Sequence, residues 1–468
     1  MSFDSLFYPF FLLIVVVLHH VLPHRYRRFL LLIASAVFYA SWNIPLTLLL
    51  YGVIAVTYCA GLLIGKWSSY QKRRKAVVSA ALVVCVCLLL YFKYFRFLMD
   101  GISSLVRLLG GRGEWQLWNV LLPVGVSFYT FQAMSYVIDV YRGRNPERDF
   151  GYYALYISFF PQLVAGPIER ADALLPQLKA ERTVTENDRK EAYRFLLSGY
   201  FRKIVLADFC GIFVDRVYSA SMPDGSAVMI GTLLFAVQIY CDFAGYSEIA
   251  RGSARLLGIH LMQNFARPYL APDIRTFWRR WHISLSGWLT DYVYIPLGGS
   301  RKGLLRQITA TVAVFLISGL WHGANWTFVL WGLLHGLLVV LCVLISRADR
   351  KVIKSRFLTI CSTALTFFCV TLLWIFFRAS SVSQAWNLFS VLFSRWNVLE
   401  GIGILQMTWQ DSVRLLLSVA GMIYLPYLTA KNENPRYMSQ VFLLLAILVA
   451  WWIRLDSGTA SAFIYFQF

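Results

Sequence analysis

Charged side chains are scarce in this sequence. Asp, Glu, Lys and Arg together make up 15% of the 468 residues, whereas 58% are hydrophobic. Soluble domains carry more charge than this, so that class is excluded. Runs without any charge approach or exceed the roughly 20 residues that a helix needs to cross a bilayer, and the sequence predicts an all-α polytopic membrane protein with about 10–12 transmembrane helices. The clearest runs are 29–65, 76–92, 325–346 and 357–377, the first long enough for two passes that turn at Asn43–Pro45.

Motifs of soluble enzymes and pumps are also missing. The sequence has no GxSxG turn of a serine hydrolase and no GxxxxGK[ST] phosphate-binding loop. An ATP-driven pump is therefore not expected, and any transferred group is expected to arrive already activated. The eight cysteines lack CxxC spacing and are interpreted as packing residues. His19, His20 and His24 resemble a metal cluster, but adjacent helical side chains point about 100° apart, so an interfacial role is expected and no metal site is predicted.

Acidic residues are outnumbered by basic ones, 24 against 44. The basic residues do not form a nucleic-acid-binding stripe, and no nucleic-acid partner is expected; they gather between apolar segments, where the positive-inside rule places them in the cytoplasm. These clusters are 24–28, 66–75, 142–148, 301–306 and 347–356. With a first pass at about Phe7–Leu22, the N-terminus and the tail from Asp456 are both expected outside the cytoplasmic (inner) membrane.

We interpret the chain as one membrane domain, residues 1–468. Residues 1–117 are expected to be N-terminal spans, residues 118–346 a core that carries the chemistry, and residues 347–468 C-terminal spans followed by an outer tail.

Within that core, Pro and Gly interrupt apolar stretches that are too short to cross the membrane twice. These stretches are Pro123–Tyr129 and Pro161–Pro167. Irregular backbone survives at membrane depth only when it is buried in protein or lines a cavity, so re-entrant segments are expected here. Residues 264–305 mix aromatic residues with arginine too finely for a span, and short helices at the inner interface are expected.

One histidine lies inside a long uncharged run. His322 falls within Gln307–Ser346, which contains no Asp, Glu, Lys or Arg. An imidazole at bilayer depth is a candidate functional residue because it can accept and return a proton. The alternative is a histidine that hydrogen-bonds a neighbouring helix. Gly319 and Gly323 flank it and allow a backbone or a thin acyl chain to approach closely, which favours the functional interpretation.

A second histidine, His282, lies 40 positions earlier in a segment rich in Arg and Trp. Guanidinium groups match phosphate oxygens, so the arginines are candidates for holding a phosphate-bearing donor, with lipid-headgroup anchoring as the alternative. The candidate donor-binding residues are Arg267, Arg279, Arg280, Arg301, Trp281 and Asn325. Together these residues indicate a group-transfer enzyme in which His322 is the general base for a hydroxyl.

Two more polar residues interrupt apolar runs. Asp242 is expected either to orient an Arg or His or to form a structural ion pair. His335 lies more than three helical turns past His322 and is expected to pack between helices.

Several motifs together resemble one family, over about residue 5 to the C-terminus. The segments that carry the resemblance are Arg280–Ser286, Tyr294–Gly299, Leu320–Trp326, Pro123–Tyr141 and Gly166–Arg170. They are similar to the membrane-bound O-acyltransferase (MBOAT) family, and to its bacterial branch that contains the alginate O-acetyltransferase membrane subunit.

The resemblance implies what spacing alone does not. In the family, the histidine that corresponds to His322 is the catalytic residue, and His282 corresponds to a second motif position, so the resemblance implies a catalytic role for both. A tunnel joins a cytoplasmic donor mouth to an outer funnel, and acetyl-coenzyme A is the donor substrate, with no tightly bound cofactor expected. A separate extracytoplasmic acetyltransferase passes the acetyl group to a polysaccharide such as alginate or cellulose.

The tail Phe463–Phe468 resembles a terminal aromatic-Tyr-aromatic motif of this branch, which implies that the Tyr465 hydroxyl is a transient acyl carrier. The alternative is an aromatic anchor at the outer interface. Two other functions stay open for the whole chain. One is transfer of D-alanine from a carrier protein to teichoic acid, and the other is transport without acyl-transfer chemistry.

Overall fold

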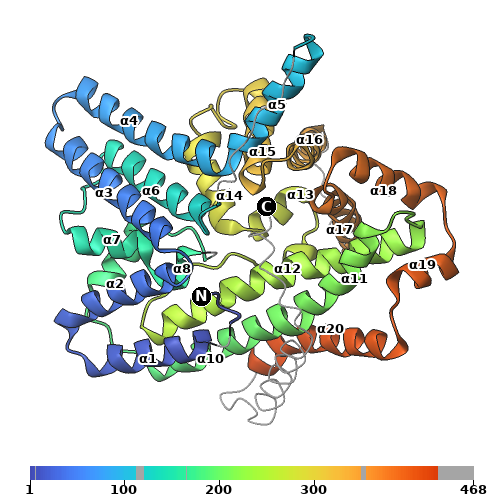
Figure 1. Ribbon diagram of the computed structural model, residues 1–468, viewed down its shortest axis with the longest axis horizontal. Helices are drawn as coiled ribbons and strands as arrows, with labels where there is room; N and C mark the ends of the chain where they lie inside the picture. Colours follow the sequence, from blue (N-terminus) through green and yellow to red (C-terminus); the bar gives the residue numbers. More distant parts are fainter. Residues whose placement is uncertain (6, 112–120, 165, 349–354, 431–468) are drawn as a thin grey trace. The chain divides into compact units, whose positions relative to one another are not determined.

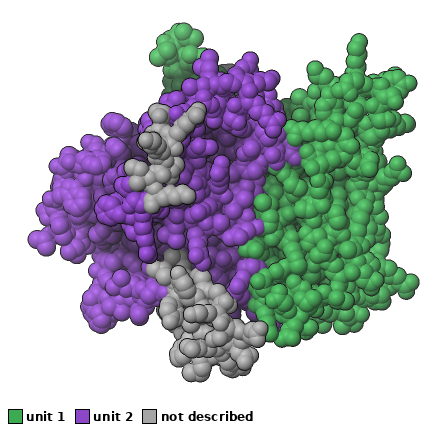
Figure 2. All heavy atoms as spheres, turned by 180° about the vertical axis from the view of Figure 1, so that it is seen from behind, with its two compact units in different colours: residues 1–192, 250–262 green, residues 193–249, 263–468 purple. Residues whose placement is uncertain are grey.

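The structure is a computed structural model that describes residues 1–5, 7–111, 121–164, 166–348 and 355–430 (Figure 1). Every regular element in these ranges is a helix, which confirms the all-α class. The chain divides into two compact units, residues 1–192 with 250–262 (unit 1) and residues 193–249 with 263–468 (unit 2), coloured separately in Figure 2. The predicted single domain and its boundaries at 118 and 347 stay a prediction.

Six helices of the described ranges are long and apolar enough to cross a membrane. Helix α1 is a shorter apolar helix, and η1 and α5 extend α4 into one continuous apolar helix. The membrane class is therefore confirmed. The six candidate spans are Ile44–Lys66, Gln71–Leu108, Gly225–Leu256, Leu304–His322, Trp326–Arg347 and Arg356–Arg378.

Unit 1 holds the N-terminal helices, and the first three of them lie where the sequence predicts. Asn43 accepts a hydrogen bond from the backbone N–H of Leu46 and starts α3, which confirms the turn between the two predicted passes. Helix α3 packs against α4 and α6, and α2 packs against α7. The helices up to α9 are α1 (Phe7–Val21), α2 (His24–Ala40), α3 (Ile44–Lys66), α4 (Gln71–Leu89), η1 (Leu90–Tyr94), α5 (Phe95–Leu108), α6 (Val126–Tyr141), α7 (Phe150–Ser158), α8 (Phe160–Leu163) and α9 (Ala171–Lys179).

The two broken segments of unit 1 lie against each other. Gly125 has φ +73° and precedes α6, and a Cβ there would lie 2.6 Å from the backbone oxygen of Leu163. Only glycine combines this backbone conformation with so close an approach. Helices α7 and α8 are short, and residues 153–164 are all buried. The irregular backbone is thus buried in protein, as the sequence predicts.

Helices α10 (Glu186–Tyr200) and α12 (Gly225–Leu256) have residues in both units. The polar segment after Ile168 is helical in two pieces, α9 and α10. The other helices belong to unit 2: η2 (Phe201–Ala207), α11 (Asp208–Ser219), η3 (Pro268–Leu270), α13 (Ile274–Arg280), α14 (Ile283–Leu289), η4 (Thr290–Tyr294), α15 (Leu304–His322), α16 (Trp326–Ala348), α17 (Arg356–Arg378), α18 (Val382–Ser394), α19 (Val398–Leu405) and α20 (Trp409–Ala430).

In unit 2, α15 and α16 form a closely packed hairpin. A Cβ on Gly319 would lie 2.3 Å from the backbone oxygen of Phe328, and a Cβ on Gly332 would lie 2.3 Å from that of Phe315. The two glycines bring the helix backbones into direct contact, as small residues do between membrane helices. The close approach predicted beside His322 is therefore made by another backbone of the same chain.

Asp242 of α12 lies in a buried ion cluster of unit 2. The Lys203 ammonium is 2.8 Å from a carboxylate oxygen of Asp242 and 2.8 Å from one of Asp208. Lys203 is 1% exposed, so its charge requires such partners. Lys203 is thus one partner of Asp242, which agrees with the structural ion pair among the two alternatives.

Candidate active site

His322 is the last residue of α15, where the hairpin turns toward α16. Its side chain is 3% exposed and is surrounded by aromatic rings. The imidazole centroid lies 5.1 Å from the ring of Trp331 and 5.1 Å from that of Phe377, both edge to face. The turn breaks regular backbone beside the imidazole, and the rings enclose it in apolar surroundings. Apolar surroundings of this kind strengthen hydrogen bonds.

His282 occupies the residue before α14 and has an unusual backbone. Its φ of +43° and ψ of 56° lie in the left-handed region, which costs a non-glycine residue about 1–3 kcal/mol. The side chain is 1% exposed, and burial lowers its pKa to about 3. At neutral pH this imidazole is uncharged, so it acts as a hydrogen-bonding group and not as a cation.

One tryptophan joins the two predicted histidines. The ring centroid of Trp321 is 5.4 Å from that of His282 and 4.9 Å from that of His322. The residues of the two motifs, 40 positions apart in the chain, are therefore separated by a single ring. Trp321 is 4% exposed, and the sequence gives no sign that it has this bridging position.

The position of His282 depends on Asn264, which sequence reasoning missed. The backbone oxygen of Asn264 accepts from the N–H of Ile283 at 2.9 Å, and its side-chain oxygen accepts from the N–H of Ser284 at 3.2 Å. Asn264 itself is 1% exposed, and its amide donates to Ser247 of α12. These bonds fix the first turn of α14 and with it the strained backbone of His282.

His335 of α16 is fully buried beside the same aromatic cluster. Its ring lies 4.8 Å from Trp331 and 5.0 Å from Trp278, and Trp331 is the ring that also contacts His322. Helix α13, which carries Trp278, packs against α16. This location agrees with the packing role expected for His335.

The predicted donor-binding arginines lie at or near the protein surface. Arg267 and Arg279 are exposed, and Arg280 donates to the backbone oxygen of Leu270 at 3.0 Å. Arg301 is also exposed. Residues 264–305 do form short helices as expected, and their location at the inner interface stays a prediction.

Trp281 and Asn325 have partners within the protein. Trp281 is 1% exposed and stacks on Phe277 at 5.5 Å. The Asn325 amide donates to the backbone oxygen of Ser380, and its side-chain oxygen accepts from the N–H of Thr327 at the start of α16. Both residues therefore support the site's framework, and their contact with a donor stays a prediction. Tyr465 lies outside the described residues.

Comparisons with known proteins bear on the family of this chain. Residues 147–383 match the model of MBOAT, the membrane-bound O-acyltransferase family. The chain is 34% identical to the probable alginate O-acetylase AlgI of Pseudomonas putida over 489 aligned positions, which cover 99% of each chain. It is 37% identical to the protein of that name from Pseudomonas aeruginosa, over 84% of this chain and 74% of that one. It is 35% identical to the peptidoglycan O-acetyltransferase of Helicobacter pylori, over 76% and 71%.

Proposed function

The chain belongs to the membrane-bound O-acyltransferase family, and from this membership we propose that it moves acetyl from cytoplasmic acetyl-coenzyme A to an extracytoplasmic polysaccharide. It is an O-acyltransferase and a membrane protein. The names of the relatives support acetyl as the group and a cell-envelope or exported polysaccharide as the acceptor, since they act on alginate or peptidoglycan.

The meeting of His282 and His322 on the ring of Trp321 carries the proposal. Acyl transfer to a hydroxyl needs one group that takes the hydroxyl proton and a second that holds the reactants in place. His322 lies at the end of α15, beside the turn 323–325 of the hairpin, and we assign it the role of taking the hydroxyl proton. His282, neutral and held by the Asn264 contacts, is assigned the second.

The transfer step balances with these groups alone. The neutral His322 imidazole accepts the acceptor hydroxyl's proton as the hydroxyl oxygen forms a bond to the thioester carbonyl carbon. The carbon–sulfur bond then breaks, the coenzyme A thiolate leaves, and the imidazolium returns its proton to that sulfur. Aromatic walls exclude water, which would otherwise compete as the acceptor.

The proposed orientation places the donor at the cytoplasmic mouth of a tunnel and both termini outside the inner membrane. Exposed Arg267 and Arg279 are available for phosphate groups of the donor. An extracytoplasmic acetyltransferase of the same pathway is the proposed partner that delivers the acetyl group to the polymer. Labelling of single engineered cysteines with an impermeant reagent tests this orientation, and cytoplasmic labelling at position 468 would contradict it.

Tyr465 is proposed as the acyl carrier between the tunnel and that partner. Tyr465→Phe removes only the hydroxyl and keeps the aromatic ring, so coenzyme A binding is expected to persist while polymer acetylation is lost. Wild-type polymer acetylation in this variant would leave the interfacial-anchor role for the tail.

An activity assay of the purified full-length protein with different acyl donors tests the proposed function. With acetyl-coenzyme A and a hydroxyl acceptor, the proposal predicts release of the free coenzyme A thiol with multiple turnovers. Turnover only with a D-alanyl carrier protein would instead support teichoic acid as the acceptor. Passage of donor or polymer across a proteoliposome membrane without cleavage of the thioester would support a transporter.

A further inference from the structure

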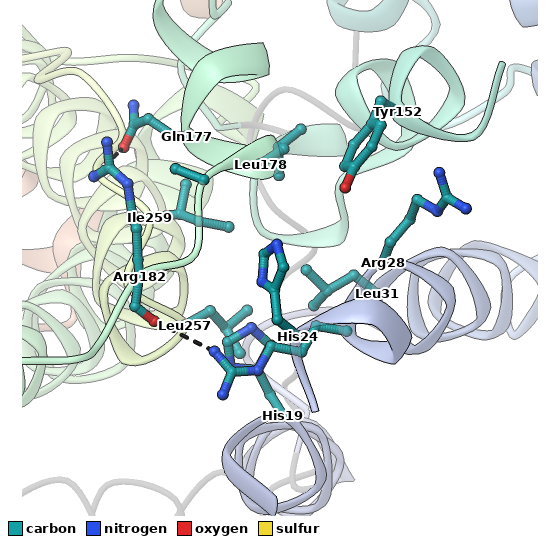
Figure 3. Close-up of a pocket in the computed structure, with 12 residues that line it drawn as sticks. His19, His24, Arg28, Leu31, Tyr152, Gln177, Leu178, Arg182, Leu257 and Ile259 are labelled. Atoms are coloured by element: carbon teal, nitrogen blue, oxygen red, sulfur yellow. Dashed lines mark hydrogen bonds between the residues drawn. The ribbon is translucent and has the colours of Figure 1, made fainter. Parts of the chain in front are cut away.

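We propose that unit 1 contains a binding site for a phosphate group, in a pocket at the start of α2. The pocket lies among side chains of α1, α2, α7 and α9 and of the segments that follow α9 and α12 (Figure 3). Its lining includes three arginines and two histidines and no Asp or Glu. These basic residues are His19, His24, Arg27, Arg28 and Arg182. None of them takes part in the transfer chemistry proposed above, so this site stands apart from that function.

The N-terminus of α2 gathers more positive charge than its own residues offset. Pro23 precedes the helix and provides no side-chain cap, and the first turn has no acidic residue. A helix N-terminus carries partial positive charge and exposed N–H groups, yet His24, Arg25, Arg27 and Arg28 all lie within the first five residues. Like charges this close repel one another and the helix dipole. A bound oxyanion would satisfy the N–H groups and remove this repulsion.

A buried polar atom at the pocket provides an independent sign of a ligand. His19 of α1 is 6% exposed and lines the pocket, and its Nδ1 has no hydrogen-bond partner in the part of the chain that the structure describes. A buried nitrogen without a partner is destabilising. A phosphate oxygen, or a water that a phosphate holds, would supply that partner.

Hydrogen bonds within the protein position Arg27 and Arg182 and use only some of their N–H donors. Arg27 donates to the backbone oxygens of Leu22 at 3.1 Å and Arg182 at 3.3 Å, and Arg182 donates to the Gln177 side chain at 3.3 Å. A guanidinium has five N–H donors, so these contacts position each group and leave others for an oxyanion. In Figure 3, His24 projects from the start of α2 into the space between these side chains.

Arg28 contributes less to the site because it already has a counterion. Its guanidinium is 2.6 Å from Asp149 and lies over the ring of Tyr152, at 5.0 Å from the centroid. Most of the attraction for an anion therefore comes from Arg27, Arg182 and His24. The shared ligand chemistry is a phosphate oxyanion with net negative charge, carried either by an anionic phospholipid headgroup or by a soluble phosphate.

Thermal unfolding of the full-length protein in nanodiscs distinguishes the two sources. Inorganic phosphate is titrated into discs of phosphatidylcholine alone, and separate discs contain phosphatidylglycerol without free phosphate. A saturable rise of the melting temperature with phosphate indicates the soluble source, and a rise only with phosphatidylglycerol indicates the lipid. Arg182→Gln is expected to weaken the phosphate response about tenfold, or to remove the lipid response. Arg182→Lys keeps the charge and is expected to retain most of it.

Arg25→Gln is the matched control, because Arg25 lies in the same helical turn, is exposed, stacks on Tyr26 and does not line the pocket. Its response is expected to equal that of the wild type. Should Arg182→Gln fail to purify, His24→Gln replaces it in the same comparison. The proposal is overturned if the wild type responds to neither probe, or if Arg25→Gln and Arg182→Gln lose the response equally.

Discussion

Histidines occupy two opposite environments in this chain. In unit 2, His282 and His322 are nearly fully buried and contact aromatic rings. In unit 1, His19 and His24 line a pocket with three arginines. The same imidazole is suited to proton transfer and neutral hydrogen bonding in the first environment and to anion binding in the second. Surroundings, and not the residue type, therefore decide which histidines are candidates for catalysis.

Among the buried histidines of unit 2, replacement of His322 by alanine is expected to have the largest effect on acetylation. Acetylation of the exported polymer is expected to fall by about 10²–10⁴-fold, the usual contribution of a positioned general base. Protein level and membrane insertion are expected to be unchanged, because one imidazole at a helix end contributes little to a bundle of this size. Polymer acetyl content and immunoblotting of the same cells measure both quantities. Normal acetylation with normal protein level would remove His322 from the mechanism.

His282→Ala is expected to have a smaller effect because this residue positions the reactants without making bonds. Turnover is expected to fall about 10–100-fold, with weaker coenzyme A binding in a titration of the purified protein. The pH profile tests whether His282 acts as a neutral group. Since burial lowers the pKa of His282 to about 3, the wild type should show no inflection from this group between pH 5 and 8. Wild-type affinity and turnover in the variant would make His282 a packing residue.

Gly319→Ala tests whether the α15–α16 contact keeps His322 in place. The added Cβ would lie 2.3 Å from the backbone oxygen of Phe328, so the helices must separate. We expect a loss of about 1–3 kcal/mol in stability, measured as a lower melting temperature in detergent, together with reduced turnover. Gly403→Ala in α19 is the control, because its Cβ would meet no atom within 4 Å. An equal change in both variants would contradict a role for close helix packing.

Glu169→Gln concerns unit 1, away from the transfer site, and changes only how stability depends on pH. Glu169 is 2% exposed and accepts from the N–H of Met262 at 2.6 Å, and burial raises its pKa to about 7. Between pH 4.5 and about 7 the folded state then binds more protons than the unfolded state, so stability falls as pH rises through this window. Glutamine removes this dependence, and the variant should gain on the order of 1–3 kcal/mol relative to wild type from pH 5 to pH 8.

The measurement for Glu169 is the difference in melting temperature between variant and wild type at the two pH values. Glu181→Gln is the control, since Glu181 is exposed in the same unit. A difference that stays constant with pH would mean that Glu169 keeps an ordinary pKa.

Much of this architecture could be predicted from hydropathy. A membrane helix forms its backbone hydrogen bonds within itself and presents apolar side chains to lipid, so it appears in the sequence as an uncharged run. The turn at Asn43 and the buried broken segments lie where such runs are interrupted. The grouping of His282 with His322 is instead expected from the motifs around the two histidines and their resemblance to one family. Which residues contact one another in the folded chain could not be predicted from hydropathy. Lys203 as the partner of Asp242, Asn264 as the support of α14, and the Gly319–Gly332 contact all depend on residues 13–39 positions apart meeting in space.

The donor-binding residues show the same limit. Arginines and tryptophans of residues 264–305 are equally suited to lipid headgroups, to packing and to a phosphate-bearing donor. The structure shows Trp281 buried among rings and Arg267 exposed, which the sequence pattern does not distinguish.

The rate of coenzyme A release by the purified protein tests the central claim most directly, that His322 is the base for acyl transfer. Wild type, His322→Ala and His335→Ala are compared at saturating acetyl-coenzyme A and a fixed hydroxyl acceptor. His335 is the matched control because it is another buried histidine of the same aromatic cluster. The account predicts that His322→Ala binds the donor normally but reacts about 10²–10⁴-fold more slowly, whereas His335→Ala stays within tenfold of wild type. Wild-type reaction by His322→Ala, or an equal loss in both variants, would contradict it.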